Sequence, residues 1–122
     1  MKAFFGLTAV ETELMELFWN AKGPLSFREI MEYITSVLKK TWKKQTLNTY
    51  LSNLQRSGLI QTERSNYYYS YMATCTREEY VHRWTRKLVE DSYGNSIGNF
   101  VAAFTGGKKL SEEDAEKLRK LI

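Results

Sequence analysis

The change in hydrophobic period at Gly58 constrains the fold of this chain more than any other sequence feature. Before this glycine, apolar residues recur every three or four positions, which is typical of amphipathic helices. The helical stripes are Val10, Leu14, Leu17 and Phe18; Phe27, Ile30, Met31, Ile34 and Leu38; and Leu47, Leu51 and Leu54. After Gly58, two short runs rich in Ile, Thr and Tyr favour strands. Because helices this short are marginal alone, we expect them to pack on one another.

The ends of the predicted helices carry their own signals. Thr8 with Glu11, and Ser26 with Glu29, have the spacing of a capping box, in which each residue's side chain accepts a hydrogen bond from the other's backbone amide. A glycine commonly ends a helix, and Gly58 directly follows the third stripe. The sequence therefore predicts helices that begin after Thr8 and after Ser26, and a third that ends before Gly58.

The predicted strands span residues 59–63 and 67–72, and the polar turn Arg64-Ser65-Asn66 joins them. Helix, helix, helix and hairpin is the element order of a winged helix-turn-helix. We therefore expect a mainly α fold with a small β-hairpin wing. Residues 1–74 are predicted to form this winged-helix domain.

Residues 75–122 are predicted to form a helical tail. Thr76 and Glu79 repeat the capping-box spacing, and Ser111 has the position of a further N-cap. The tail has apolar stripes but too few residues to bury them by itself. We expect two tails to cover these stripes in a homodimer, and a tail folded back on its own winged domain is the alternative. The predicted dimerisation residues are Trp84, Leu88, Ile97, Phe100, Val101, Phe104, Leu118 and Leu121.

Positive charge is concentrated in the middle of the chain. Segment 39–64 holds six basic residues and one acidic residue, so its net charge of +5 exceeds the +4 of the whole chain. These residues are Lys39, Lys40, Lys43, Lys44, Arg56 and Arg64, with the acid Glu63. A local positive field of this kind favours nucleic-acid binding, with the lysines placed to neutralise phosphates.

The third predicted helix has the pattern expected of a recognition helix. With its leucines turned inward, its other faces carry short polar side chains and one arginine. These residues are Thr46, Asn48, Thr49, Ser52, Asn53 and Arg56. Such groups hydrogen-bond base edges in a major groove without repelling phosphate. A merely solvated face is the alternative, and the absence of any acid from 39 to 62 counts against it. We predict that this face, with Lys43 and Lys44, binds double-stranded DNA.

The predicted wing leaves two questions open. Arg64, at its turn, either contacts the DNA backbone or minor groove or belongs to an ordinary surface turn. Four tyrosines in the second predicted strand resemble a stacking platform for single strands. They are Tyr67, Tyr68, Tyr69 and Tyr71. Strand alternation would turn two of them inward, so we favour packing of the sheet against the helices.

The residue inventory argues against an enzyme. His82 is the one histidine and Cys75 the one cysteine, so no metal cluster and no Cys–His pair is predicted. The sequence has no glycine-rich phosphate loop, and we expect no cofactor. A single cysteine fits a reducing compartment, and no segment has the features of a signal peptide or a membrane span. The chain is therefore expected to be cytoplasmic, with no direct insertion into a membrane.

A set of residues along nearly the whole chain has an order and spacing that resemble a known family. They are Leu7, Thr8, Glu11, Glu13, Met15, Leu17, Phe18, Trp19, Trp42, Thr46, Thr49, Leu51, Leu54, Gly58, Leu59, the wing segment 67–71, Glu79 and Tyr80, and more loosely 110–118. The family is that of the penicillinase repressors, which contains the β-lactamase and methicillin-resistance repressors and the copper-responsive repressors.

The resemblance implies a homodimer that binds a palindromic operator and represses adjacent genes. It places Thr46 and Thr49 in the recognition helix and Lys43 and Lys44 near phosphate. Where many members have an arginine late in that helix, this chain has Asn53, so a different operator sequence is expected.

The resemblance also bears on regulation. In the β-lactamase branch, a membrane sensor binds the antibiotic and the repressor is then cut at an Asn–Phe bond in its tail. Asn99-Phe100 is similar to that bond, although Phe100 also has a structural reason to be apolar, so cleavage stays open. The copper branch has a cysteine cluster near its C-terminus. This chain has no cysteine after Cys75, and copper sensing is disfavoured.

Two functions are compatible with the sequence. One is a dimeric repressor that binds a palindromic operator and is released either by proteolysis, in a β-lactam-sensing pathway, or by another signal. The other is a winged helix used as a protein–protein interaction module without sequence-specific DNA binding. An interaction helix more often presents an apolar face, so the polar Thr46, Thr49 and Asn53 favour the repressor.

Overall fold

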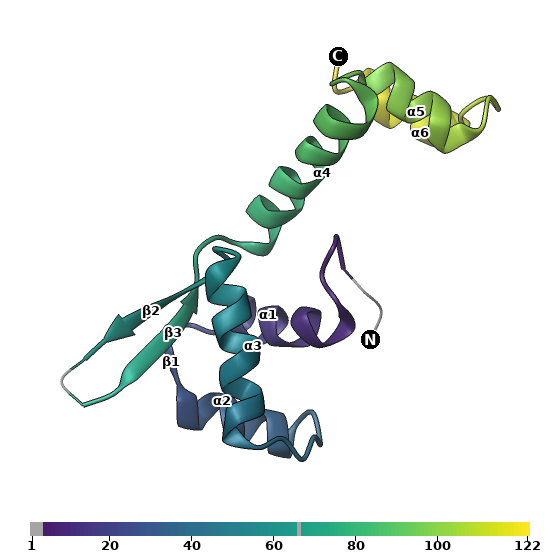
Figure 1. Ribbon diagram of the computed structural model, residues 1–122. Helices are drawn as coiled ribbons and strands as arrows, with labels where there is room; N and C mark the ends of the chain where they lie inside the picture. The colour runs from purple at the N-terminus through teal and green to yellow at the C-terminus, as the bar shows by residue number, and fades with distance from the viewer. Residues whose placement is uncertain (1–3, 66) are drawn as a thin grey trace. The chain divides into compact units, whose positions relative to one another are not determined.

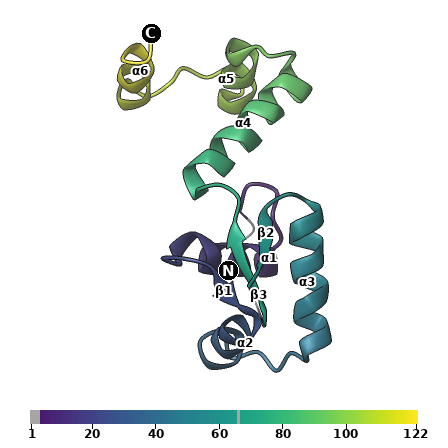
Figure 2. The ribbon, with the colours of Figure 1, turned by 90° about the vertical axis from the view of Figure 1, so that its left-hand side faces the viewer.

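The computed structural model describes residues 4–65 and 67–122, which divide into two compact units, Met1–His82 and Arg83–Ile122. In the first unit, helices α1 (Ala9–Asn20), α2 (Phe27–Ser36) and α3 (Lys44–Arg56) pack against an antiparallel sheet (Figure 1, Figure 2). The sheet holds β1 (Leu25–Ser26), β3 (Tyr69–Ala73) and β2 (Ile60–Arg64), in that order. The predicted fold class, a winged helix-turn-helix followed by helices, is confirmed.

The predicted capping boxes are present. Glu11 donates its backbone amide to Thr8 Oγ1 at 3.2 Å, and Thr8 donates its own amide to Glu11 Oε1 at 2.9 Å. Ser26 and Glu29 exchange the same pair of bonds at the start of α2. Each box satisfies backbone donors that the first helical turn otherwise leaves unpaired. The starts of α1 and α2 are therefore determined by local sequence.

The sheet differs from the prediction in two respects, the start of β3 and the presence of a third strand. β2 and β3 form the expected hairpin, but β3 begins at Tyr69, where it pairs with Arg64, rather than at residue 67. The sequence did not predict β1, whose Leu25 pairs with Tyr71 on the other edge of β3. A strand of two residues has no alternation to detect. Since Ser26 lies in β1 and also caps α2, this pairing joins the start of α2 directly to the sheet.

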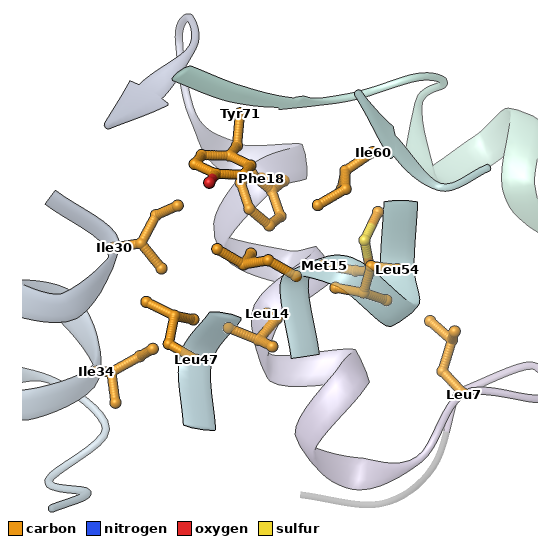
Figure 3. Close-up of a cluster of buried hydrophobic side chains, with 11 residues drawn as sticks. Leu7, Leu14, Met15, Phe18, Ile30, Ile34, Leu47, Leu54, Ile60 and Tyr71 are labelled. Atoms are coloured by element: carbon orange, nitrogen blue, oxygen red, sulfur yellow. The ribbon is translucent and has the colours of Figure 1, made fainter. Parts of the chain in front are cut away.

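The core of the first unit takes side chains from α1, α2 and α3 and from the sheet (Figure 3). Leu14, Ile30, Ile34, Leu47 and Leu54 each expose 0% of their surface. The core also includes Leu7, Met15, Phe18, Leu51, Ile60 and Tyr71. Burying an aliphatic side chain of this size contributes about 1.5–3 kcal/mol, so this cluster holds the three helices and the sheet together.

The second unit contains the rest of α4 (Arg77–Tyr93), α5 (Ile97–Thr105) and α6 (Glu112–Arg119). Ser111 caps α6 as predicted, because its hydroxyl accepts the backbone amide of Asp114 at 3.1 Å. Gly106 ends α5 with a left-handed φ of 63° that favours glycine. Among the described residues of this unit, Val89 is the one buried hydrophobic side chain. In the part of the chain that the structure covers, no helix is both long and apolar enough to cross a membrane.

The contacts of the first unit continue into α4. Thr76 and Glu79 form the predicted capping box, with bonds of 3.0 Å and 3.1 Å, and Tyr80 packs against the core of the first unit. The compact unit therefore ends at His82, beyond the boundary after residue 74 that the sequence suggested. The functional division into 1–74 and 75–122 stays a prediction.

Candidate nucleic-acid interface

Helix α3 presents an apolar face to the core and polar side chains to solvent. The buried residues of α3 are Leu47, Leu51 and Leu54. Most of the predicted DNA-contacting residues are exposed, and Thr46 alone among them is half-buried. The exposed ones are Lys43, Lys44, Asn48, Thr49, Ser52, Asn53, Arg56 and Arg64. The helix therefore exposes the predicted polar residues to solvent, with Thr46 half-buried among them.

Local hydrogen bonds orient several of these side chains. The Thr49 hydroxyl donates to the carbonyl of Gln45 at 3.0 Å, which directs its oxygen and leaves that oxygen free to accept. Arg56 Nη1 donates to Asn53 Oδ1 at 3.3 Å. Both the guanidinium and the amide retain further N–H donors after this bond. The face thus offers donors and acceptors whose positions are already restricted.

The start of α3 differs from the starts of α1 and α2. Its N-cap residue, Lys43, forms no hydrogen bond through its side chain to the first turn of the helix. That turn also contains no acidic residue. Two exposed lysines, Lys43 and Lys44, stand there instead, at the positive end of the helix dipole. Positive charges at this end disfavour the helix slightly, by about 0.3–1 kcal/mol each, but they suit an anion. The two lysines therefore add positive charge at a helix end that already favours an anion, at a small cost in helix stability.

Lys40 has a different environment from the lysines with which its charge grouped it. Its Nζ pairs with Glu13 Oε1 at 3.5 Å and lies 5.9 Å from the centre of the Trp42 ring. Trp42 in turn stacks on Tyr50, with ring centres 4.8 Å apart and planes 8° from parallel. Lys40 therefore ties the loop before α3 to α1, whereas Lys39, Lys43 and Lys44 remain exposed.

The wing tyrosines do not alternate as predicted. Tyr67, Tyr68 and Tyr69 expose 95%, 60% and 52% of their surface, and Tyr71 is the one of the four that is buried. The expectation of two inward rings was wrong. Tyr67 and Tyr68 precede β3, and Tyr69 shares a face with Tyr71 but lies at the end of the hairpin, opposite Arg64, where it stays exposed. Burial raises the pKa of the Tyr71 hydroxyl above its ordinary value.

Arg64 lies at the end of β2, with its guanidinium 5.7 Å from the centre of the Tyr69 ring. The ring therefore supports the arginine at an exposed position. Asn66, the last residue of the predicted turn, lies outside the described residues.

A groove that the sequence did not indicate lies beside the wing. Residues of α2, β3 and the start of α3 line a volume of about 1120 Å³. Phe27 and Met31 contribute its apolar part, and Lys44, Tyr68 and Tyr69 contribute polar ends. These residues come from three separate parts of the chain, so no local sequence pattern predicts the groove. It brings the start of α3 and the exposed tyrosines to one surface.

Helices α1 to α3, the hairpin and the exposed polar face of α3 define a winged helix-turn-helix protein. The model of the penicillinase repressor family matches residues 7–122. The chain therefore belongs to the penicillinase repressor family, as the sequence resemblance indicated.

Individual relatives match over nearly the full length of this chain. The methicillin resistance regulatory protein MecI of Staphylococcus aureus strain N315 is 22% identical over 97% of this chain and 94% of its own. The penicillinase repressor of Bacillus licheniformis is 19% identical over 100% of this chain and 93% of its own. An uncharacterized 16.5 kDa protein of Latilactobacillus sakei, from the ptsI 3′ region, is 27% identical over 95% of this chain and 77% of its own.

Family membership identifies the chain as a transcriptional repressor. Members of this family are regulatory proteins rather than enzymes, which agrees with the sequence prediction. Across the described residues, no group of three or more His, Cys, Asp and Glu side chains is arranged to hold a metal ion.

Proposed function

We propose that this protein is a dimeric repressor that binds a palindromic DNA operator through the polar face of α3. The observation that carries the proposal is the combination on α3 of exposed hydrogen-bonding side chains with two exposed lysines and no acid. A helix placed in a major groove needs this combination, because it must approach phosphates closely and still bond to base edges.

The side chains of the interface divide into two roles. Lys43 and Lys44 neutralise phosphates at the edge of the groove, and Arg64 contacts the backbone or minor groove from the wing. The base-contacting group is Thr46, Asn48, Thr49, Ser52, Asn53 and Arg56. An arginine suits the acceptors of guanine, and an asparagine suits the acceptor and donor of adenine. The bond between Arg56 and Asn53 couples two such contacts.

The tail supplies the dimer. Ile97, Phe104 and Leu121 are exposed, and Trp84, Leu88, Phe100, Val101 and Leu118 are only half-buried. An apolar surface of this kind is typical of a protein interface. A two-fold symmetric pairing lets the same stripes cover one another in both copies, and it matches the symmetry of a palindromic operator.

The competing function is a protein–protein interaction module. Such a module needs a largely apolar contact face, because the centre of an interface is depleted of charge. The exposed face of α3 is polar and basic. This contrast favours DNA as the ligand.

Selection of bound sequences from random duplex DNA, with the purified full chain at near-physiological salt, tests the proposal. Recovery of an inverted repeat, with half-sites about one helical turn or more apart, is the expected result. Recovery of no motif, with binding that disappears as salt rises, would show only non-specific attraction. The interaction module would then become the better explanation.

We propose further that cleavage between Asn99 and Phe100 releases the repressor in a β-lactam-sensing pathway that begins at a membrane sensor. Two relatives are named for methicillin resistance and penicillinase, which supports this class of signal. The bond lies in the first turn of α5, where Asn99 donates its backbone amide to Ser96 Oγ at 3.1 Å. Proteases bind extended chains, so this turn must open first. Gly98 lowers the cost of opening because glycine is a poor helix former.

An immunoblot of the native host exposed to a β-lactam tests the cleavage. A fragment ending at Asn99 is expected, and it should be absent with the Asn99→Ala variant and present with Asn95→Ala as the control. Loss of repression without any fragment would contradict proteolytic release.

A further inference from the structure

The groove beside the wing has the size and the composition of a small-molecule site. We call it the wing groove and define it by Phe27, Met31, Lys44, Tyr68, Tyr69 and Tyr71. All of these residues belong to the first compact unit. Ligand sites in proteins typically have volumes of about 300–1000 Å³ and a mostly apolar lining, with a few polar groups that orient the ligand. At about 1120 Å³, the wing groove has room for such a ligand together with water.

The apolar part of the lining is rich in aromatic rings. Phe27 and Met31, on α2, are half-buried and pack against the core, so their positions are restricted. Tyr71 is buried, whereas Tyr68 and Tyr69 expose 60% and 52% of their surface. Aromatic rings and a thioether both make favourable contacts with a flat ring system. The wing groove is therefore suited to a ligand with an aromatic body.

The charged residues of the lining leave one cation over. Arg28 pairs with Glu32 on the same helix, with Nε and Oε1 3.3 Å apart. The carboxylate of Glu29 accepts the backbone amide of Ser26 at 3.0 Å in the cap of α2. Among the described residues, no acid forms an ion pair with the exposed Lys44. A ligand with one negative group would therefore find one available partner, Lys44, in the lining.

A stretch of DNA backbone fits the wing groove less well than a small anion does. A DNA strand carries one negative charge at every nucleotide, whereas α2 adds two carboxylates, Glu29 and Glu32, to the lining. Phe27 and Met31 offer no side-chain hydrogen bond to a phosphate. A ligand with a single charge and an apolar body avoids both disadvantages.

We propose that the wing groove binds an aromatic monoanion, and that this ligand competes with operator DNA for Lys44. The competition rests on the proposed function, in which Lys44 neutralises a phosphate, but the binding of the ligand does not. An anion paired with Lys44 removes that phosphate contact, and each of the two ligands then lowers the affinity for the other by the same factor. Such a ligand releases the repressor from DNA without any cleavage of the chain.

Calorimetric titration of the full chain with 2-naphthoate tests the site. The uncharged 2-naphthamide, which has the same ring system, is the control ligand. Lys44→Glu is compared with Lys43→Glu, and Tyr68→Ala with Tyr67→Ala. Lys43 and Tyr67 are exposed neighbours in the sequence that do not line the groove. Because all four side chains are exposed, each variant should fold as the wild type does.

The two pairs of variants should differ in opposite ways. Lys44→Glu should lower the affinity for 2-naphthoate about tenfold and Lys43→Glu less than about threefold, with 2-naphthamide binding nearly unchanged in both. Tyr68→Ala should weaken both ligands about fivefold through lost stacking, and Tyr67→Ala should weaken neither. Equal losses within either pair, or no binding to the wild-type chain, would overturn the inference. Loss of operator affinity in Tyr68→Ala without any binding of 2-naphthoate would assign the groove to the DNA backbone.

Binding of the selected operator with and without 2-naphthoate, at constant ionic strength, tests the competition. With the ligand at about ten times its Kd for the wild type, the apparent operator affinity of the wild type should fall about tenfold, and that of Lys44→Glu about twofold. An unchanged operator affinity in the saturated wild type would overturn the competition. Failure of the wild-type chain to select any inverted repeat would instead reject the proposed function, and the calorimetric result would stand.

Discussion

The core of the first unit and the apolar stripes of the second have very different exposures. Leu14, Ile30 and Leu47 are fully enclosed by the winged unit, whereas Ile97, Phe104 and Leu121 expose 67%, 78% and 82% of their surface. The apolar side chains are similar in kind, so the difference lies in how many elements surround them. Three helices and a sheet enclose the first set, while short helices around Val89 leave the second set open. The winged unit therefore buries its own core, and we expect the stability of the tail to depend on the proposed association.

The largest expected effect lies in the core of the winged unit. Leu51→Ala should lower the free energy of unfolding by about 2–5 kcal/mol, because it leaves a cavity that closed packing cannot fill. Ser52→Ala, the next residue on the exposed side of the same helix, should change it by less than about 0.5 kcal/mol. Urea unfolding of the full chain measures both. Similar losses in the two variants would mean that α3 does not divide into buried and exposed faces.

A tail substitution should act on association instead. Phe104→Ala is expected to weaken the dimer about 10-fold to 100-fold, as for an aromatic residue at an interface, with little change in melting of the winged unit. Tyr67→Ala, which removes an exposed aromatic ring from the wing, should leave the dimer unchanged. Sedimentation equilibrium measures the association. A dimer that persists in Phe104→Ala, or in a chain ending at residue 82, would place the contact outside the tail.

Substitutions within the interface should separate recognition from attraction. Thr49→Ala should cost about 1–3 kcal/mol of binding to the selected operator and relax the choice at one base step. Lys43→Ala should weaken binding to all sequences and reduce the salt slope by about 1. Binding titrations over a range of salt distinguish the two. Equal, sequence-independent losses would remove Thr49 from the recognition group.

The smallest expected effect concerns the cap of α2. Hydrogen bonds from the backbone and side chain of Ser26 hold the pKa of Glu29 below its ordinary 4.5. A carboxyl with a lowered folded pKa stabilises the protein above its unfolded pKa and loses that contribution as pH falls through the folded pKa. Glu29→Gln should therefore flatten the acid side of the stability curve slightly. Thermal unfolding from neutral to acidic pH, with Glu32→Gln as control, measures it. An identical acid limb in the two variants would contradict the assignment.

The elements and most of the interface follow from the sequence because their signals are local. Thr8, Ser26 and Thr76 each begin a helix through bonds to a residue three positions away. The spacing of the leucines in α3 predicts which side is buried, and hence which polar residues are exposed. The winged-helix fold could be predicted for the same reason.

Other features required the tertiary structure because their partners are distant in the chain. By its charge and position in the sequence, Lys40 was grouped with the interface lysines, but it forms an ion pair with Glu13 on α1. Leu25 lies in a strand only because it can pair with Tyr71 at the open edge of β3. The exposure of the wing tyrosines depends on where the pairing of β2 with β3 ends.

The sequence by itself thus determined the helices, their buried faces and the acid-free polar surface, since each depends on neighbours within a turn or two. Only the tertiary structure decided which charges are free, where the sheet ends and how α4 is held. Trp19 and Cys75 are 56 positions apart, and Tyr80 and Phe5 are 75 apart. Contacts over such separations form only when the whole core brings the segments together, so no periodicity or spacing along the chain encodes them.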